Sequence, residues 1–500
     1  MRAKPTVTYT DEQQAIIDCD ARVVVADAKA GTGKTTTGIG FAKRRPHASL
    51  LYMAYNKSLQ LEATQRFGEN TECRTTHSLA FQAVGKHYSH RVSFNWRALN
   101  VRNELNLSNI RAAAIAQSVL IAFFQSTASE ITLEHAGEAE LKFHASEHEM
   151  AAGVLDAKVL WRRMQDRSDT VTMSPDAYLK MWALTNPRLN YDFIICDEWQ
   201  DANPVTAHIV EQQRHARLLV LGDPHQSIYA FRGAINAMEQ FPGATRLHLS
   251  KTWRFGPKVA QVANLVLSEL KKEQVLIKGM GEDIPYRSGA PVTRLARTNA
   301  QLFKEAVLLE GRGVHWVGGV EKYKFDRILD AYYLFANQRE RINDPFLRYF
   351  TSYGDMVAYA TESKDPETKI LAQVIDEYRH DTPRLVQLVK TNAVKDQPDA
   401  QLTLSTGHGA KGLDFDYVQL ADDFEILQEC ETMLVADPFA QLPHQELNLL
   451  YVALTRAKKE IALNADTRQW LQNLPRHRRD RAEALERARA RQEPFPTHAA

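Results

Sequence analysis

A strand, a loop and a helix near the N-terminus restrict the fold of this chain more than any other stretch. Apolar, mostly β-branched residues at 23–26 predict a buried strand, and residues 36–44 predict a helix. The loop between them ends in Gly33-Lys34-Thr35. In this context loop N–H groups and the positive helix end can hold the phosphates of ATP, while Lys34 adds a charge and Thr35 a ligand for Mg²⁺. The alternative is an ordinary turn, and Ala28 stands where the phosphate-binding pattern opens with Gly.

A second apolar run carries two adjacent carboxylates at its C-terminal end. Residues 193–196 predict a buried strand, and Asp197 and Glu198 follow it directly. This arrangement suits a site for Mg²⁺ and ATP, in which Asp197 holds the metal directly or through water and Glu198 polarises the attacking water. A solvated acidic turn is the alternative interpretation.

Aromatic residues and an arginine follow another predicted strand, at 217–221. Tyr229, Phe231 and Arg232 lie a few residues beyond its end, in the stretch that begins with Gly222. Aromatic rings beside an arginine suit base stacking and phosphate contact in a protein that binds single-stranded nucleic acid. Such residues are also common in hydrophobic packing, so both interpretations stay open.

The composition places further limits on partners and compartment. Lys and Arg number 62 against 61 Asp and Glu, so a nucleic-acid partner requires local basic patches rather than a basic chain. The four cysteines are far apart, without the spacing of a zinc or iron–sulfur site, and fit a reducing compartment. No run reaches membrane-spanning length and no signal peptide is apparent. We therefore expect a cytoplasmic protein with no membrane partner.

The chain is too long for one hydrophobic core and shows the pattern of an α/β protein with two parallel-sheet units. We expect the first unit at 1–94 and 186–248 and the second at 249–318 and 399–474, with a strand at 246–249 where the second unit begins. Helix-rich insertions interrupt them at 95–185 and 319–398, and an Arg-rich tail covers 475–500. ATP held between the two units can use arginines of the second, so that hydrolysis changes their closure.

Over residues 9–465 the motifs resemble, in order, those of superfamily 1 helicases of the UvrD/Rep/PcrA type. Asp197-Glu198-Trp199-Gln200-Asp201 is close to motif II, the stretch from Gly222 to Gly233 to motif III, and Thr455-Arg456 belongs to a string like motif VI. The string Tyr55-Asn56-Lys57 is also similar to the corresponding motif of the F-box DNA helicase branch. The resemblance implies two RecA-like P-loop domains, with subdomains named 1A and 2A and insertions named 1B and 2B.

The resemblance also implies roles for individual residues. Gln13, in a helix predicted at 9–20 and capped by Thr10, corresponds to the adenine-reading glutamine, although a plain solvated residue is the alternative. The residues expected to bind ATP are Gln13, Ala28, Lys29, Ala30, Gly31, Thr32, Gly33, Lys34, Thr35, Thr36, Trp253, Arg254, Gly412, Asp414 and Arg456. Those expected to take part in catalysis are Lys34, Asp197, Glu198, Gln226, Arg254 and Arg456, with Thr35 and Asp197 at the metal. Those expected to contact DNA are Tyr55, Asn56, Lys57, Thr76, His77, Tyr229, Phe231, Arg232, Thr406 and His408.

These residues predict an ATP-dependent translocase on single-stranded DNA that unwinds tailed duplexes, and the resemblance implies 3′→5′ polarity. Two alternatives stay open at this point. A nucleic-acid-stimulated ATPase that acts as a switch and unwinds little is one, because the insertion at 319–398 is far shorter than the regulatory 2B subdomain of the family. The second alternative is a helicase that acts on RNA, because at many contacts single-stranded RNA differs from single-stranded DNA only in its 2′-hydroxyl group.

Overall fold

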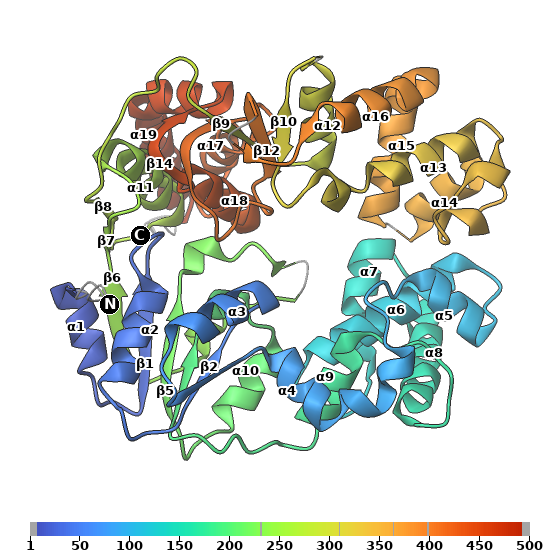
Figure 1. Ribbon diagram of the computed structural model, residues 1–500, viewed down its shortest axis with the longest axis horizontal. Coiled ribbons are helices and arrows are strands. Elements are labelled where there is room, and N and C mark those ends of the chain that lie inside the picture. The colour runs from blue at the N-terminus through green and yellow to red at the C-terminus, as the bar shows by residue number, and fades with distance from the viewer. Residues whose placement is uncertain (1–7, 231–232, 310, 364, 398–399, 493–500) are drawn as a thin grey trace, which may run out of the picture. The chain divides into compact units, whose positions relative to one another are not determined.

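The computed structural model describes residues 8–230, 233–309, 311–363, 365–397 and 400–492. It divides into two compact units (Figure 1). The first is formed by Met1–Ala28, Gly33–Leu249 and Asp326–Pro383, and the second by Lys29–Thr32, Ser250–Phe325 and Arg384–Ala500. Each unit is built around one six-stranded sheet, which confirms the expected α/β class.

The sheet of the first unit is parallel throughout. Its strand order is β3 (Thr71–Arg74), β2 (Leu50–Met53), β4 (Phe193–Cys196), β5 (Arg217–Gly222), β1 (Val23–Ala28) and β6 (Thr245–Leu249). The central strands are continuous apolar runs because helices cover both faces of such a sheet. The carboxyl ends of β1, β4 and β5 therefore meet at one edge, where ligands bind in open α/β sheets.

Strand β6 belongs to the first sheet, because it pairs in parallel with β1 from Val24↔Thr245 to Ala28↔Leu249. The expectation that the second unit begins with this strand is therefore wrong. Sequence spacing does not reveal which neighbour a strand pairs with, and the apolar face of this strand is completed by the core beside β1.

Four of the helices around this sheet begin at a capping side chain; the exception is α2, which begins at Lys34, two residues before the predicted start. The helices are α1 (Asp11–Ile17), α2 (Lys34–Lys43), α3 (Lys57–Arg66), α4 (Thr76–Ala83) and α10 (Pro204–Glu211). The cap of α1 is reciprocal, because the Thr10 hydroxyl accepts from the Gln13 N–H at 3.1 Å and the Gln13 amide oxygen accepts from the Thr10 N–H at 3.0 Å. Gln13 is consequently buried rather than solvated.

The first helical segment is a bundle whose buried apolar residues form one continuous cluster with those on one face of the first sheet (Figure 1). It contains α5 (Ala98–Leu105), α6 (Ile110–Gln125), α7 (Gly137–Phe143), α8 (Glu147–Gln165) and α9 (Pro175–Ala183). Helix α6 is apolar around most of its circumference because its neighbours surround it. Within the described part of the chain, no single helix is long and apolar enough to cross a membrane; the bent pair of α5 and α6 passes that test by length and composition.

A buried lysine in this bundle predicts a pH dependence of stability. Lys180 is 1 % exposed, donates to the Ser126 carbonyl oxygen at 2.7 Å and lies 4.4 Å from the Phe123 ring centre. Burial lowers the pKa of Lys180 to about 8. Between pH 8 and the ordinary lysine pKa near 10.5 the unfolded chain binds the proton more tightly, so stability rises as the pH increases through that window. Below pH 8 the free energy of unfolding is lowered by the full cost of burying the charged lysine, on the order of 1–3 kcal/mol.

A comparison of the wild type with Lys180→Met isolates this contribution. As the pH is raised from 7 to 10, the free energy of unfolding of the wild type should increase relative to that of Lys180→Met. Urea unfolding midpoints of both proteins measure this change. A difference that stays constant over this range would show that Lys180 keeps its ordinary pKa in the folded chain.

The second helical segment contains α13 (Phe325–Phe335), α14 (Tyr353–Glu362), α15 (Pro366–Tyr378) and α16 (Thr382–Thr391). Most of it groups with the first unit, although the sequence enters and leaves it through the second sheet. Arg97, at the start of α5, pairs with Asp365 at 3.3 Å and also with Glu367, and its guanidinium lies 4.4 Å from the Phe346 ring centre. These contacts join the two helical segments, and charged residues on segments so far apart carry no sequence signal of pairing.

The sheet of the second unit is also parallel. Its order is β11 (Ala393–Val394), β10 (Val314–Trp316), β12 (Leu402–Thr406), β9 (Val292–Ala296), β13 (Phe415–Leu420) and β14 (Ala457–Ala462). Helices α11 (Pro257–Lys271), α12 (Asn299–Val307), α17 (Leu427–Ala436) and α18 (His444–Leu454) accompany it, together with the short strands β7 (Lys251–Thr252) and β8 (Lys278–Gly279). Strand β11 lies in the stretch expected to be helical, because two residues are too few to show a strand pattern.

The last described helix, α19, runs from Ala465 to Gln492 through Pro475. The Arg-rich stretch from 475 is therefore helical as far as it is described. Arg481 forms an ion pair with Glu269 of α11, and the buried Glu431 of α17 accepts from the Trp470 indole N–H at 2.8 Å. These contacts fix the helix to α11 and α17 despite the proline.

Candidate functional site

The loop between β1 and α2 has the backbone of a phosphate cradle. Gly31 and Gly33 have φ of +72° and +83°, in the left-handed region that favours glycine. Gly33 is also the N-cap of α2, so the first N–H groups of this helix remain free of a side-chain cap. A Cβ atom at Gly33 would lie 2.8 Å from the Gln13 amide nitrogen, which places Gln13 against the loop. The structure thus brings together two parts of the predicted ATP site.

The carboxylates at the end of β4 contact the start of α2. The Lys34 Nζ lies 3.0 Å from Glu198 Oε1, and the Thr35 hydroxyl donates to Asp197 Oδ2 at 3.1 Å. Glu198 has φ of +53°, an uncommon conformation for a residue with a side chain, and the Gln200 amide donates to it at 2.5 Å. Strain of this kind is frequent where a side chain must be aimed at a reacting group.

The charges of this cluster perturb one another. Burial and the negative charge of Glu198 raise the pKa of Asp197 above its ordinary value, and Lys34 opposes this only in part. Burial disfavours the charged form of Lys34, but the carboxylates of Glu198, Asp223 and Asp197 outweigh it and raise the pKa of Lys34. The cluster contains more negative than positive charge, so a further cation would stabilise it.

The donor set fits Mg²⁺ held together with a nucleotide. Thr35 and Asp197 present adjacent oxygen ligands, which Mg²⁺ prefers. No group of three or more His, Cys, Asp or Glu side chains that could hold a metal occurs in the described residues. Mg²⁺ at phosphate sites needs no such cage, because it uses one or two protein ligands, waters and phosphate oxygens. Thr35 and Asp197 would hold it.

Three residues of this site were not predicted from the sequence: Tyr52, Gln200 and Asp223. The Tyr52 hydroxyl donates to Asp197 Oδ2, and Asp223 accepts from the Gln226 amide at 2.7 Å. The Gln200 side-chain oxygen accepts from the Asp223 N–H at 3.0 Å. Asp223 follows β5 directly, so its position after a buried strand was a usable signal. Gln200 belongs to the string close to motif II, although no role was predicted for it. Tyr52 gave no signal, because a buried tyrosine is ordinary in a core.

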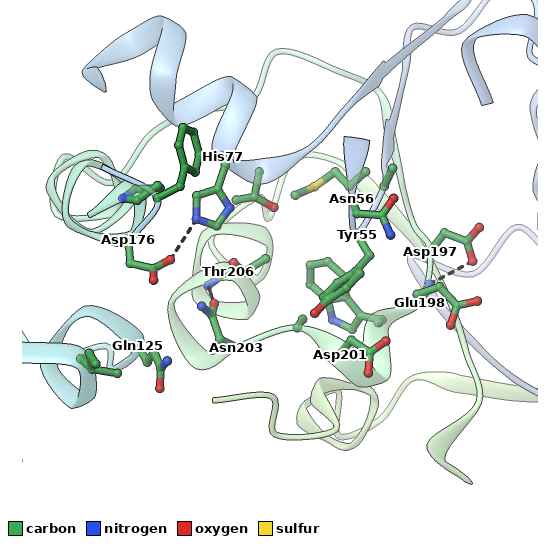
Figure 2. Close-up of a pocket in the computed structure, with 18 residues that line it drawn as sticks. Tyr55, Asn56, His77, Gln125, Asp176, Asp197, Glu198, Asp201, Asn203 and Thr206 are labelled. Atoms are coloured by element: carbon green, nitrogen blue, oxygen red, sulfur yellow. Dashed lines mark hydrogen bonds and ion pairs between the residues drawn. The ribbon is translucent and has the colours of Figure 1, made fainter. Parts of the chain in front are cut away.

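A groove of about 730 Å³ extends from this cluster toward the helical bundle (Figure 2). It is lined by residues of three predicted stretches and by the bundle, namely Tyr55, Asn56, Thr76, His77, Phe94, Ile121, Gln125, Asp176, Asp197, Glu198, Asn203 and Thr206, among others. In Figure 2, Gln125 and the pair of Asp197 and Glu198 lie at opposite sides of the view, with Tyr55 between them. The groove thus connects four of the predicted DNA contacts with the acidic pair.

Aromatic and polar groups of the groove are held in place by their neighbours. Tyr55 stacks on Tyr229, with ring centres 5.4 Å apart and 14° between the planes. His77 Nε2 lies 3.0 Å from Asp176 Oδ1. Asn56 caps α3 by accepting from the Leu59 N–H at 3.0 Å. Flat rings beside polar groups in an open groove suit single-stranded nucleic acid.

Phe94 is a further groove residue that sequence reasoning missed. Its side chain is 90 % exposed and lines the groove from the segment before α5. An isolated phenylalanine outside any motif gave no signal of this placement. Lys57 lies beyond the groove lining and donates to Gln60 at 2.8 Å. Phe231 and Arg232, the predicted stacking and phosphate residues, lie outside the described residues.

Family comparisons give a consistent result. Residues 53–242 match the UvrD/REP helicase N-terminal domain, and residues 326–467 match the UvrD-like helicase C-terminal domain. The chain belongs to the UvrD-like helicase family. The predicted resemblance, and with it the RecA-like P-loop class of the two sheets, is therefore confirmed.

Three relatives illustrate the position of this UvrD-like chain within the family. F-box DNA helicase 1 of Gallus gallus is 34% identical over 91% of this chain and 48% of its own length. F-box DNA helicase protein 1 of Schizosaccharomyces pombe is 32% identical over 92% of this chain and 58% of its own. ATP-dependent DNA helicase UvrD2 of Mycobacterium tuberculosis is 25% identical over 55% of this chain and 47% of its own length. The chain thus spans about half the length of the curated relatives it matches, and the predicted likeness to the F-box branch is confirmed.

The UvrD-like motifs of the second unit contact one another around Arg254. Its guanidinium lies 2.8 Å from Asp414 and donates to the Thr455 carbonyl oxygen at 3.4 Å. Trp253 beside it is 58 % exposed. Gly412 has φ of +83°, which only glycine adopts readily. The structure thus brings together three of the predicted ATP-binding residues of this unit. Arg254 and Asp414 form the ion pair, and Gly412 lies in the turn just before Asp414.

Arg456 lies in the turn after α18 rather than within a helix. Helix α18 ends at Leu454, and β14 begins at Ala457. The Thr455 hydroxyl between them donates to the Tyr451 carbonyl oxygen at 2.9 Å. Arg456 is 1 % exposed and donates to the carbonyl oxygens of Val452 at 2.8 Å and Leu413 at 3.3 Å.

The two predicted DNA contacts of the second unit lie at the end of β12, which Thr406 closes, and in the turn after it, where His408 lies. The Thr406 hydroxyl accepts from the Gly409 N–H at 3.0 Å and so shapes the turn that carries His408. Their roles toward DNA stay predictions, as do those of Trp253, Arg254, Asp414 and Arg456 toward ATP.

Proposed function

We propose that the chain is an ATP-dependent translocase on single-stranded DNA, and a DNA helicase with 3′→5′ polarity. One observation carries the proposal. A single groove is lined at one side by Asp197 and Glu198 and elsewhere by Tyr55, Asn56 and His77. Nucleic acid in this groove would touch the loop that also carries the acidic pair, so binding and hydrolysis share residues. The three relatives are named as DNA helicases, which supports the same conclusion.

The chemistry assigned to this chain is phosphoryl transfer from ATP to water. Lys34 and the N–H groups at the start of α2 bind the β- and γ-phosphates. Mg²⁺, when bound, neutralises phosphate charge. Glu198, held by Lys34 and by the Gln200 amide, orients the attacking water and accepts its proton. Gln226, which donates to Asp223 beside β5, is assigned the role of sensing the γ-phosphate.

DNA binding is assigned mainly to stacking. The net charge of +1 excludes a uniform electrostatic hold on the phosphate backbone. Tyr55 and Tyr229 present a pre-formed pair of rings, and Phe94 presents an exposed ring from the bundle. Base–aromatic stacking tolerates any sequence, which a translocating protein requires. In this proposal each cycle of ATP binding and hydrolysis changes how the groove holds successive bases, and the protein thereby moves along the DNA strand.

Single-strand binding by a Tyr55→Ala variant tests the assignment of the groove. The loss of one stacking platform should weaken binding of oligo(dT) by about 1–3 kcal/mol, or roughly 5–150-fold, with little change in salt dependence. Fluorescence anisotropy at several salt concentrations measures both quantities. Tyr349→Ala is the control, since this tyrosine is exposed, at 61 %, and lies outside the groove.

Two results would contradict the assignment. Equal losses in both variants would mean that the groove tyrosine has no special part in binding. Stronger stimulation of ATP hydrolysis by oligo(rU) than by oligo(dT) of the same length would favour RNA as the substrate.

A further inference from the structure

Tyr52 is a buried titratable residue of the site to which no role has been assigned. It lies on β2, is 1 % exposed, and its ring packs against Phe67 with centres 4.7 Å apart. Strand β2 pairs with β4, and Tyr52 is opposite Ile195 in that register. Because β4 continues into Asp197, the tyrosine hydroxyl reaches the Asp197 carboxylate and donates to its Oδ2 atom.

The Asp197 carboxylate is held by three donors. Its Oδ1 atom accepts from the Glu198 N–H at 2.9 Å, and its Oδ2 atom accepts from both Thr35 and Tyr52. The Thr35 hydroxyl is also the expected ligand of the metal. The Tyr52 hydroxyl is therefore the donor that can hold Oδ2 whichever way Thr35 turns.

We infer that Tyr52 is a positioning residue for the metal-binding carboxylate, acting through Asp197 and not on the nucleotide itself. The inference rests on the proposed function, in which Asp197 and Thr35 hold Mg²⁺ with ATP. A carboxylate that must meet the near-ideal octahedral geometry of Mg²⁺ gains from a fixed orientation. Loss of a hydrogen-bond partner behind a metal ligand typically costs 10–100-fold in metal affinity.

Tyr52→Phe tests this inference, because the ring and its packing against Phe67 remain and only the hydroxyl is removed. Mn²⁺ binding in the presence of adenylyl imidodiphosphate, titrated by electron paramagnetic resonance, should weaken by about tenfold or more. In parallel, the Mg²⁺ concentration for half-maximal ATP hydrolysis should rise by a similar factor. The rate at saturating Mg²⁺ should recover to a much larger extent, because the ligands themselves are intact.

Tyr88→Phe is the matched control. Tyr88 is 5 % exposed and its hydroxyl donates to the Gln165 carbonyl oxygen at 2.9 Å, within the helical bundle. The Tyr88→Phe substitution should leave Mn²⁺ affinity unchanged. Thermal unfolding of both variants measures how much stability is lost when a buried tyrosine hydroxyl is removed. Mn²⁺ affinity of Tyr52→Phe within twofold of the wild type, or an equal loss in Tyr88→Phe, would overturn the inference.

The two proposals can fail separately. A wild-type protein that hydrolyses no ATP with DNA present would contradict the proposed function, and the Mn²⁺ titration would still decide the role of Tyr52. A wild type that hydrolyses ATP and unwinds DNA, with Tyr52→Phe indistinguishable from it in the Mn²⁺ titration, would remove only the inference about Tyr52.

Discussion

Glu198→Gln is expected to slow DNA-stimulated ATP hydrolysis by about 10²–10⁴-fold, the contribution of a positioned general base. Glutamine keeps the size of the side chain and its contact with the Gln200 amide, but it cannot accept a proton from water. Lys34→Ala should cause a comparable loss for a different reason, since it removes the cation that lies 3.0 Å from Glu198 and beside the phosphate loop. Steady-state phosphate release with oligo(dT) measures both variants.

Glu62→Gln provides the control for this experiment. Glu62 lies on α3, is 59 % exposed and pairs only with Arg66 one turn away among the ion pairs of the described residues, so its neutralisation should leave turnover unchanged. Near wild-type hydrolysis by Glu198→Gln or Lys34→Ala, with contaminating ATPase excluded by identical purification, would show that the phosphate site has been assigned to the wrong residues.

Arg456→Ala is expected to lower the stability of the second unit by about 2–4 kcal/mol, because a buried guanidinium and its hydrogen bonds are lost together. The side chain is 1 % exposed and bonds to Val452, Leu413 and the Thr455 hydroxyl, all within its own unit. The family resemblance separately implies a role for this arginine in phosphoryl transfer, where such residues contribute roughly 10³–10⁵ in rate.

Thermal and urea unfolding must therefore accompany the kinetics of this variant. Arg254→Ala is the informative comparison, because the Arg254 side chain is more exposed, at 17 %, and its Asp414 partner is 38 % exposed. We expect Arg254→Ala to cost much less stability, so that a slower turnover in that variant can be interpreted directly. Unchanged unfolding of Arg456→Ala would contradict the structural role derived from its hydrogen bonds.

Local features of the sequence predicted much of the catalytic part of the site. Continuous apolar strands that end in Gly, Lys or carboxylate residues are visible in a single sequence, because a parallel sheet buries both faces of its strands. Lys34, Thr35, Asp197 and Glu198 were predicted in this way, and the structure brings them into contact. Thr10 likewise marked the start of α1, because its capping box is a local pattern.

Features that depend on pairing between distant segments could not be predicted in this way. The contact of Tyr52 with Asp197 requires the register of β2 against β4, and β6 joined the first sheet through its pairing with β1. The contact of Arg97 with Asp365 joins segments 268 residues apart. Such contacts arise from the fold as a whole, and no periodicity in the chain specifies them.

Strand displacement on tailed duplexes tests the central claim most directly. With Mg²⁺ and ATP, the protein should release the labelled strand from a duplex with a 3′ single-stranded tail, and much less from one with a 5′ tail. Adenylyl imidodiphosphate in place of ATP, or Glu198→Gln in place of the wild type, should abolish the release. Hydrolysis of ATP that DNA stimulates, without displacement from either substrate, would contradict the helicase assignment and identify the chain as a DNA-stimulated switch.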